Sequence, residues 1–167
     1  PTILDCASIV GPKEAQGPLA EYFDQTLEDE FWGEKTWEKA ESKIIKETVN
    51  TVISKSGVPS DQIDLMIAGD LLNQCISSSF GLREANIPFL GVFGACSTFV
   101  ESMCIGSICV ESFAKNVLCA ASSHFCSAEK QFRFPLELGN QRPQSSQWTV
   151  TGSGAAILSS SGTGPFI

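Results

Sequence analysis

Short apolar runs alternate with longer segments of helical periodicity along this chain, and this alternation limits the possible folds more than any other feature. The apolar runs cover residues 2–10, 63–68, 89–93 and 116–121, with a glycine-containing run at 148–158. The helical segments cover residues 35–56, 77–85 and 96–113. Strands that alternate with helices through short connections form layered sheets. We therefore expect an α/β fold with five strands and layered helices.

The segments between the predicted strands differ in how many charged residues they contain. Residues 35–56 carry lysines and glutamates opposite an apolar face, which is typical of an amphipathic helix, and Gly57 ends it. Residues 96–113 hold no charges except Glu101 and Glu111, so we expect that helix to be buried nearly all round. The acidic segment 18–33 is predicted to be a long surface loop with room for one helical turn.

Length and cysteine content indicate a domain that needs no covalent cross-links. A chain of 167 residues can bury a hydrophobic core. Its seven cysteines are odd in number and lie mostly in apolar runs, which indicates free thiols in a reducing compartment. The chain has a single histidine, His124, and no C-x-x-C pair, so the common zinc sites are excluded. We expect no metal and no cofactor.

Net charge and hydropathy restrict the partners. The net charge is −8 and no basic stripe is present, which disfavours binding to nucleic acid. The uncharged stretch 143–167 is rich in Ser, Thr, Gly and Gln instead of aliphatic residues, and no basic segment followed by an apolar one opens the chain. We expect neither a transmembrane segment nor a signal peptide here, so membrane attachment would require a partner.

The first candidate site is the turn Gly94–Thr98, where a predicted strand becomes a predicted helix. Unpaired backbone N–H groups at a helix N-terminus stabilise a thiolate, and they can instead hold a bound carboxylate. Cys96 is therefore a candidate nucleophile or anion-binding residue. The alternative is that Cys96 is a small core residue, as free cysteines usually are. We assign the other six cysteines to packing, with Cys126 the least certain of them.

The second candidate site is the polar loop that follows the strand at 116–121. It offers the imidazole of His124, the ring of Phe125 and the guanidinium of Arg133. Ligands gather at the carboxyl edge of α/β sheets, and a guanidinium recognises carboxylates in a two-point manner. The alternative is an interface loop in which His124 is hydrogen-bonded and Arg133 forms a surface ion pair. Glycines 152 and 154 lack the context of a phosphate-binding turn and indicate close packing in a strand.

Several strings of residues resemble known families. I-P-F-L-G-V-F-G-A-C-S-T, V-L-C-A-A-S-S-H and T-V-T-G-S-G-A-A-I-L resemble the N-terminal half of the thiolase and ketoacyl-synthase-III superfamily. The string S-S-H-F-C-S-A-E-K-Q-F-R-F-P is more restrictive and resembles the stage V sporulation protein AD family. The superfamily fold is a five-layer α-β-α-β-α sandwich of two similar halves, usually dimerised along an edge strand. The resemblance implies that residues 1–167 are one thiolase-like half with a mixed sheet, and that the C-terminal half lies outside this chain.

The narrower resemblance implies a function in sporulation. It predicts non-enzymatic binding of dipicolinic acid, pyridine-2,6-dicarboxylic acid, alone or with calcium, for uptake into the developing spore. The implied partners are other stage V sporulation A membrane proteins and a second copy of the chain, at the spore inner membrane. Cys96 matches the acyl-carrying cysteine of the condensing enzymes, whose remaining catalytic residues come from the other half, so no catalytic residue is expected. The predicted ligand-binding residues are Cys96, Ser97, Thr98, His124, Phe125 and Arg133.

Two alternatives remain at this point. One is acyl transfer at Cys96 from coenzyme A or an acyl carrier protein, as in the condensing enzymes. The other is a docking subunit of a spore membrane complex that contacts its partners through the acidic cluster Asp24–Glu34. The closing residues 162–167 resemble the approach to a further strand, so we expect this chain to be part of a longer protein.

Overall fold

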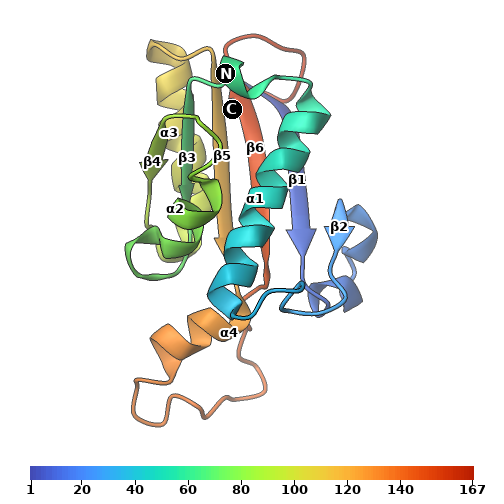
Figure 1. Cartoon of the computed structure of the whole chain (residues 1–167), viewed down its shortest axis with the longest axis vertical. Helices are drawn as coiled ribbons and strands as arrows, with labels where there is room; N and C mark the ends of the chain where they lie inside the picture. Colours follow the sequence, from blue (N-terminus) through green and yellow to red (C-terminus); the bar gives the residue numbers. More distant parts are fainter.

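A single six-stranded sheet organises the structure, a computed structural model that describes all of Pro1–Ile167 (Figure 1). The strands are β1 (Thr2–Val10), β2 (Gln25–Thr26), β3 (Leu65–Gly69), β4 (Phe89–Gly91), β5 (Asn116–Ser123) and β6 (Gly152–Ser159). Their order across the sheet is β2-β1-β6-β5-β3-β4. β6 runs antiparallel to its neighbours β1 and β5, and the other pairs are parallel. The mixed α/β fold is confirmed.

The strand count differs from the prediction by one. The additional strand, β2, has two residues and pairs with Ile9 and Val10 at the end of β1. It lies in the acidic segment that we predicted to be a loop, which also contains a short 3-10 turn, Ala20–Tyr22. Two residues are too few to show the alternating pattern by which a strand is recognised in a sequence.

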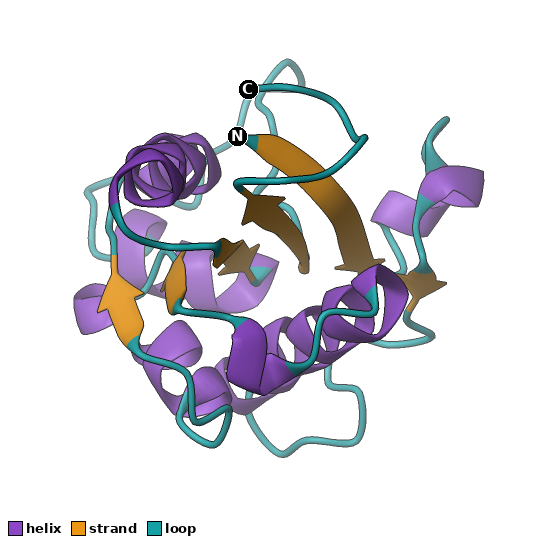
Figure 2. Ribbon diagram, turned by 90° about the horizontal axis from the view of Figure 1, so that it is seen from above, coloured by secondary structure: helices purple, strands orange, loops and turns teal.

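Helices cover the two faces of the sheet. α1 (Trp37–Ser56) and α2 (Ile76–Leu82) lie on one face, and α3 (Thr98–Ser112) lies on the other, as Figure 2 shows. α1 begins where the Thr36 hydroxyl accepts a hydrogen bond from the Lys39 amide at 3.3 Å. It ends at Gly57, whose φ of 68° places the residue in the left-handed region that glycine favours. The predicted helix at 35–56 is confirmed.

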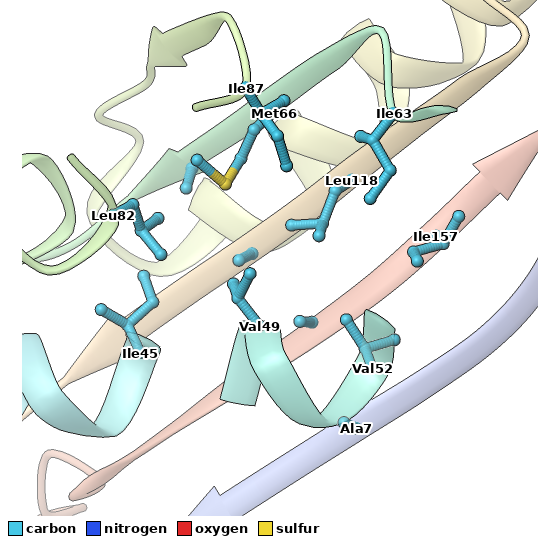
Figure 3. Packing of buried hydrophobic residues seen from close by; sticks show 13 residues of the cluster. Ala7, Ile45, Val49, Val52, Ile63, Met66, Leu82, Ile87, Leu118 and Ile157 are labelled. Atoms are coloured by element: carbon cyan, nitrogen blue, oxygen red, sulfur yellow. The ribbon is translucent and has the colours of Figure 1, made fainter. Parts of the chain in front are cut away.

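The strands divide their side chains between two hydrophobic cores. Met66 and Leu118 face α1 and α2, where they pack against Val49 and other buried residues (Figure 3). The adjacent residues Ile67 and Cys119 face α3 on the opposite side of the sheet. Because side chains alternate between faces along a strand, strands covered on both faces are apolar throughout. This explains the continuous apolar runs of β3 and β5.

The prediction that the helix at 96–113 is buried nearly all round is wrong. α3 buries one face against the sheet, where Gly106 lies so close to β5 that an added Cβ would be 2.8 Å from the Cys119 sulfur. Its outer face exposes Val100, Cys104 and Ile108, and nothing else in this chain covers them. The lack of charged residues correctly indicated an apolar helix. It does not establish that other residues of this chain pack against every face of that helix.

Two further expectations need correction. The loop predicted after β5 begins with α4 (Phe125–Ala128) and continues as a π-helical turn, Glu129–Arg133. The last strand starts at Gly152, later than predicted, because residues 143–151 remain outside the sheet. An added Cβ on Gly152 would be 2.8 Å from the Ile9 carbonyl oxygen, so the close strand packing expected of this glycine is confirmed. An added Cβ on Gly154 would meet no atom within 4 Å, so the same expectation is wrong for Gly154.

Candidate functional site

The candidate residues gather at one edge of the sheet. Because β1, β3, β4 and β5 run in the same direction, their carboxyl ends meet there, at the lower end of the sheet in Figure 1. The N-terminus of α3 follows β4 and α4 follows β5, so both predicted site segments leave the sheet at this edge. This is the edge at which open α/β sheets collect ligands.

Cys96 lies in a tight turn that presents its side chain to solvent. Ala95 has a φ of 52°, an unusual left-handed conformation for a residue with a side chain. The Thr98 hydroxyl accepts a hydrogen bond from the Gly94 amide at 3.1 Å and donates one to the Ala95 carbonyl at 2.9 Å. Cys96 is exposed and lies two residues before Thr98, the first residue of the 15-residue helix α3. The alternative that this cysteine is a core residue is therefore wrong.

A hollow of about 620 Å³ opens beside this turn. Cys96, Thr98 and Phe99 form one side of it, and Ser122 and Trp148 contribute to the rest. None of its lining residues is charged. A ligand in the hollow would therefore meet a thiol, hydroxyls, aromatic surface and the backbone of the turn. The N-terminus of α3 favours an anion there, and the Glu101 carboxylate in the first turn of that helix opposes it.

His124 does not line this hollow, because its side chain is fully buried and fully engaged. Its Nδ1 accepts a hydrogen bond from the Cys126 amide at 3.2 Å, so it acts as the cap of α4. Because Nδ1 accepts a hydrogen bond, the neutral imidazole carries its hydrogen on Nε2. This Nε2 lies 2.8 Å from the Glu30 carbonyl oxygen and donates a hydrogen bond to it. The imidazole thus connects α4 to the acidic segment and leaves no free nitrogen for a ligand.

The remaining cysteines have separate environments. Cys109 and Cys119 are buried, as expected of packing residues, and burial raises the pKa of Cys119 to about 12. Burial and the neighbouring Glu30 carboxyl, which accepts a hydrogen bond from its thiol, raise the pKa of Cys126 to about 12. Cys6 and Cys104 are exposed, so their assignment to packing is wrong. Cys126 stays a neutral thiol at physiological pH.

A second, smaller pocket of about 220 Å³ lies beside α4. Phe125 and Arg133 line it together with Trp37, Arg142 and Trp148. Arg133 forms an ion pair with Glu129 over 3.0 Å between its Nε and the carboxylate, which agrees in part with the ion-pair alternative considered from the sequence. The second pocket thus combines guanidinium groups with aromatic rings.

The six predicted ligand-binding residues do not converge on one place. Cys96 and Thr98 line the larger hollow, whereas Phe125 and Arg133 line the second pocket. Ser97 is exposed at the turn, where its hydroxyl donates to the Gly94 carbonyl, and it lines neither. Trp148 lines both spaces and forms a shared wall.

Sequence reasoning missed a buried acidic cluster beneath this edge of the sheet. The Glu41 carboxylate accepts hydrogen bonds from the Ser122 and Ser127 hydroxyls at 3.1 and 3.0 Å. Burial, with the Asp70 carboxylate as second cause, raises the pKa of Glu41 to about 7. The position of Glu41, one turn before the buried Ile44 on the same helix face, is a signal that could have identified it.

Sequence reasoning also missed Trp37, Arg142 and Trp148. Arg142 and Trp148 lie in a polar segment with no periodicity, and Trp37 is far from them in the sequence. No local pattern could have connected these three residues. The structure contains no group of three or more His, Cys, Asp or Glu side chains arranged to hold a metal ion. None of its helices combines the length and apolarity needed to cross a bilayer.

Comparison with solved structures shows the fold family. 3-oxoacyl-[acyl-carrier-protein] synthase III from Aquifex aeolicus superposes with a TM-score of 0.62 at 14% identity, over 96% of this chain and 54% of that one. The corresponding synthase III from Thermus thermophilus gives a TM-score of 0.61 at 14% identity, over 95% of this chain and 51% of that one. At this level of identity the likeness establishes a thiolase-like fold and nothing about activity.

Comparison by sequence shows the narrower family. The chain is 45% identical over 158 residues to stage V sporulation protein AD of Bacillus subtilis (strain 168). The match covers 94% of this chain and 47% of that protein, so the chain spans about half the length of this relative. The family model for stage V sporulation protein AD matches residues 1–167. The chain belongs to the stage V sporulation protein AD family.

Proposed function

We propose that this chain takes part in the non-enzymatic binding of dipicolinic acid for its uptake into the developing spore. Membership of a sporulation protein family supports the biological setting. One observation carries the non-enzymatic part: Cys96 is open to the hollow, while the only histidine of the chain, His124, is buried with both ring nitrogens bonded elsewhere. A cysteine that receives no base from its own chain can still contribute to a binding surface.

The hollow beside Cys96 is our proposed binding place. Its aromatic wall suits a flat pyridine ring, and the backbone N–H groups at the start of α3 suit a carboxylate. Each charge-assisted hydrogen bond contributes roughly 1.5 to 3 kcal/mol, so a few such contacts support modest affinity. Modest affinity is appropriate for a carrier that must release its ligand.

Calorimetric titration of the purified protein with dipicolinate tests this proposal. Cys96→Trp should fill part of the hollow and weaken binding at least tenfold. Cys104→Trp is the matched control. Cys104 is also an exposed cysteine, but it lies within α3 and does not line the hollow. Absence of saturable heat with the unmodified protein, or equal affinity in both variants, contradicts the proposal.

A second candidate is acyl transfer at Cys96, favoured by the exposure of this thiol at the start of α3. In that case Cys96 is alkylated rapidly by iodoacetamide, and an acyl-CoA adds the mass of its acyl group. We expect neither reaction to exceed that of Cys104, which is exposed on the same helix and serves as the internal reference. A covalent acyl adduct on Cys96 in a mass spectrum would replace the binding proposal by the enzymatic one.

Membership of the sporulation protein family also supports a proposed location and proposed partners for this chain. We propose a peripheral protein at the spore inner membrane, associated with other stage V sporulation A membrane proteins, that takes up dipicolinate with or without calcium. A homodimer along the sheet edge is supported by β4, an outer strand with Phe89 and Leu90 exposed. Leu90→Lys should lower the dimer fraction measured by sedimentation, and an unchanged fraction argues against this edge.

A further inference from the structure

Two acidic residues are buried beneath the carboxyl edge of the sheet. Glu41 lies four residues after Trp37, where α1 begins, and Asp70 directly follows β3. These acidic residues are 0% and 1% exposed. Figure 1 shows α4 at the N-terminal end of α1, the end at which Glu41 lies. Acidic side chains are rarely buried without a partner of opposite charge, so the surroundings of this pair decide its chemistry.

The Asp70 carboxylate is surrounded by hydrogen-bond donors. Its Oδ1 accepts a bond from the Leu72 amide at 2.8 Å, and its Oδ2 accepts bonds from the Ser78 amide and hydroxyl at 2.7 and 2.6 Å. The Ser78 hydroxyl also lies 3.2 Å from the Cys75 carbonyl oxygen, but the Asp70 oxygen is nearer and takes its hydrogen. An aspartate that only accepts bonds is in its ionised form. Asp70 therefore carries a negative charge beside Glu41.

The groups that act most strongly on Glu41 include no cation. Its carboxyl oxygens contact the uncharged hydroxyls of Ser122 on β5 and Ser127 on α4, and Ser77 of α2 also acts on it. The ionisable groups in and around α4 are bonded elsewhere, namely His124 to Glu30 and the Cys126 amide, Cys126 to Glu30, Glu129 to Arg133 and Arg142, and Lys130 to Glu38. The pair of acidic residues thus lacks a compensating positive charge.

The contacts of Ser127 indicate which group holds a proton. The Ser127 Oγ lies 3.0 Å from Glu41 Oε2 and 3.1 Å from the His124 carbonyl oxygen. A serine hydroxyl has one hydrogen, so it donates fully to only one of these two oxygens. Both contacts are hydrogen bonds when Glu41 is protonated, because Glu41 then donates to Ser127 and Ser127 donates to the His124 carbonyl.

Electrostatics supports the protonated form of Glu41. Burial and the neighbouring Asp70 carboxylate raise its pKa to about 7. The serine hydroxyls lower this pKa, and the N-terminus of α1 favours the ionised form as well. Burial is the largest of these effects, so Glu41 keeps its proton in the folded protein below neutral pH and loses it above.

We propose that Glu41 is a proton-dependent switch that holds α4 and the Ser122 end of β5 against α1 while it is protonated. Loss of the proton places a second negative charge beside Asp70 and leaves one Ser127 hydrogen for two acceptors. α4 then separates from α1 more often.

The switch makes the shape of this sheet edge depend on pH. α4 carries Phe125, which lines the second pocket, and Ser122 lines the hollow beside Cys96. Both spaces therefore change when α4 moves. The inference concerns the protein without ligand, so it does not depend on the proposed function or on which molecule binds there.

Hydrogen exchange followed by mass spectrometry, at pH values from 5 to 8, tests the inference on the purified protein. Protection factors correct for the pH dependence of exchange itself. Those of α4 should fall by about tenfold or more as pH rises across this range, since the opened state releases the Glu41 proton. This exchange should not depend on low urea concentrations, because a local opening exposes little surface, whereas exchange of β6 should depend on them.

Two variants identify the group that holds the proton. Glu41→Gln keeps a neutral side chain at this position, so its α4 protection should stay constant with pH. Glu47→Gln is the matched control, since Glu47 lies on the same helix and bonds only Asn50, and it should keep the original pH dependence. Asp70→Asn removes the neighbouring charge and should move the midpoint of the transition to lower pH.

The pH series on the original protein decides the matter even if a variant fails to fold. Protection of α4 that is constant from pH 5 to 8 overturns the inference. A decrease that α4 shares with β6, with the same dependence on urea, reports global unfolding alone and overturns it as well. A folded Glu41→Gln variant that keeps the original pH dependence assigns the proton to another group, which is equally contradictory.

Discussion

At the scale of single residues, His124 shows how burial changes the role of a reactive side chain. A histidine in a polar loop is expected to titrate and to contact ligands. Here the imidazole caps α4 through the Cys126 amide and bonds the Glu30 carbonyl. Its burial therefore indicates a structural role, in which it fixes the helix that carries Phe125 against the acidic segment.

His124→Ala should destabilise the protein by about 2 to 4 kcal/mol, because it leaves a cavity and two partly buried backbone groups without partners. Urea unfolding measures this loss, with Ser97→Ala at an exposed position as the control. Dipicolinate affinity of the folded variant should remain within twofold of the original. A variant of full stability that no longer binds the ligand would instead support direct contact.

Glu41 is the second residue whose environment sets its chemistry. Burial and the Asp70 carboxylate raise the pKa of Glu41 to about 7, from an ordinary value of 4.5. Between these pH values the folded protein holds a proton that the unfolded chain releases. Stability from this residue is therefore greatest below pH 4.5 and declines as pH rises toward 7, by an amount on the order of 3 kcal/mol.

Glu41→Gln should remove this dependence. The variant should gain stability relative to the original protein as pH increases from 5 to 8, as measured by denaturant unfolding at each pH. Asp61→Asn, at an exposed position, should show no such trend. A stability difference between Glu41→Gln and the original protein that is constant across this pH range contradicts the raised pKa.

At the scale of elements, close contacts between backbones decide how the helices lie on the sheet. α1 and α2 approach each other so closely at Gly81 that an added Cβ would overlap the Ser42 carbonyl oxygen. A backbone oxygen within α1 cannot move aside as a flexible side chain can. Glycine at this position is thus required by the packing of two helices, although it lies inside a helix, where glycine is unfavourable.

Gly81→Ala should destabilise the protein by roughly 1 to 3 kcal/mol, because the two helices must separate. Gly154→Ala is the matched control, since an added Cβ there meets no atom within 4 Å. Thermal unfolding should show a lower midpoint for Gly81→Ala and little change for Gly154→Ala. An equal midpoint for both variants contradicts the close approach.

At the scale of the whole molecule, the outer face of α3 is an apolar surface that nothing else in this chain covers. Val100 is 61% exposed and Ile108 is 66% exposed, with Cys104 between them on the same face and Phe113 just beyond the helix. A continuous apolar stripe of this kind marks an interaction surface. The 167-residue chain by itself should therefore self-associate.

Light scattering during size-exclusion chromatography tests this expectation on the 167-residue chain. The pair Val100→Glu and Ile108→Lys should shift it toward the monomer. Leu19→Glu and Leu136→Lys change exposed apolar residues elsewhere to the same charges and should leave the association unchanged. A monomer for the original chain at micromolar concentration, or equal association in both double variants, contradicts the expectation.

Features that depend on local order along the chain can be recognised from the amino-acid sequence. The amphipathic pattern of α1, the apolar runs of β3 and β5 and the turn before α3 are all properties of neighbouring residues, and so is the restrictive string around His124 that indicated the family. Patterns with the period of a strand or a helix are visible without a structure because they arise from backbone geometry.

Which side chains meet is a property of the folded molecule. Folding buries His124 and Glu41, places Cys96 and Arg133 at different pockets, and brings Trp37 and Trp148 to the same one. Such contacts join residues far apart in the chain, and they depend on how strand ends and connecting segments pack in three dimensions. No local pattern encodes that packing, and so the second pocket, which Trp37, Arg142 and Trp148 line, could be recognised only in the folded molecule.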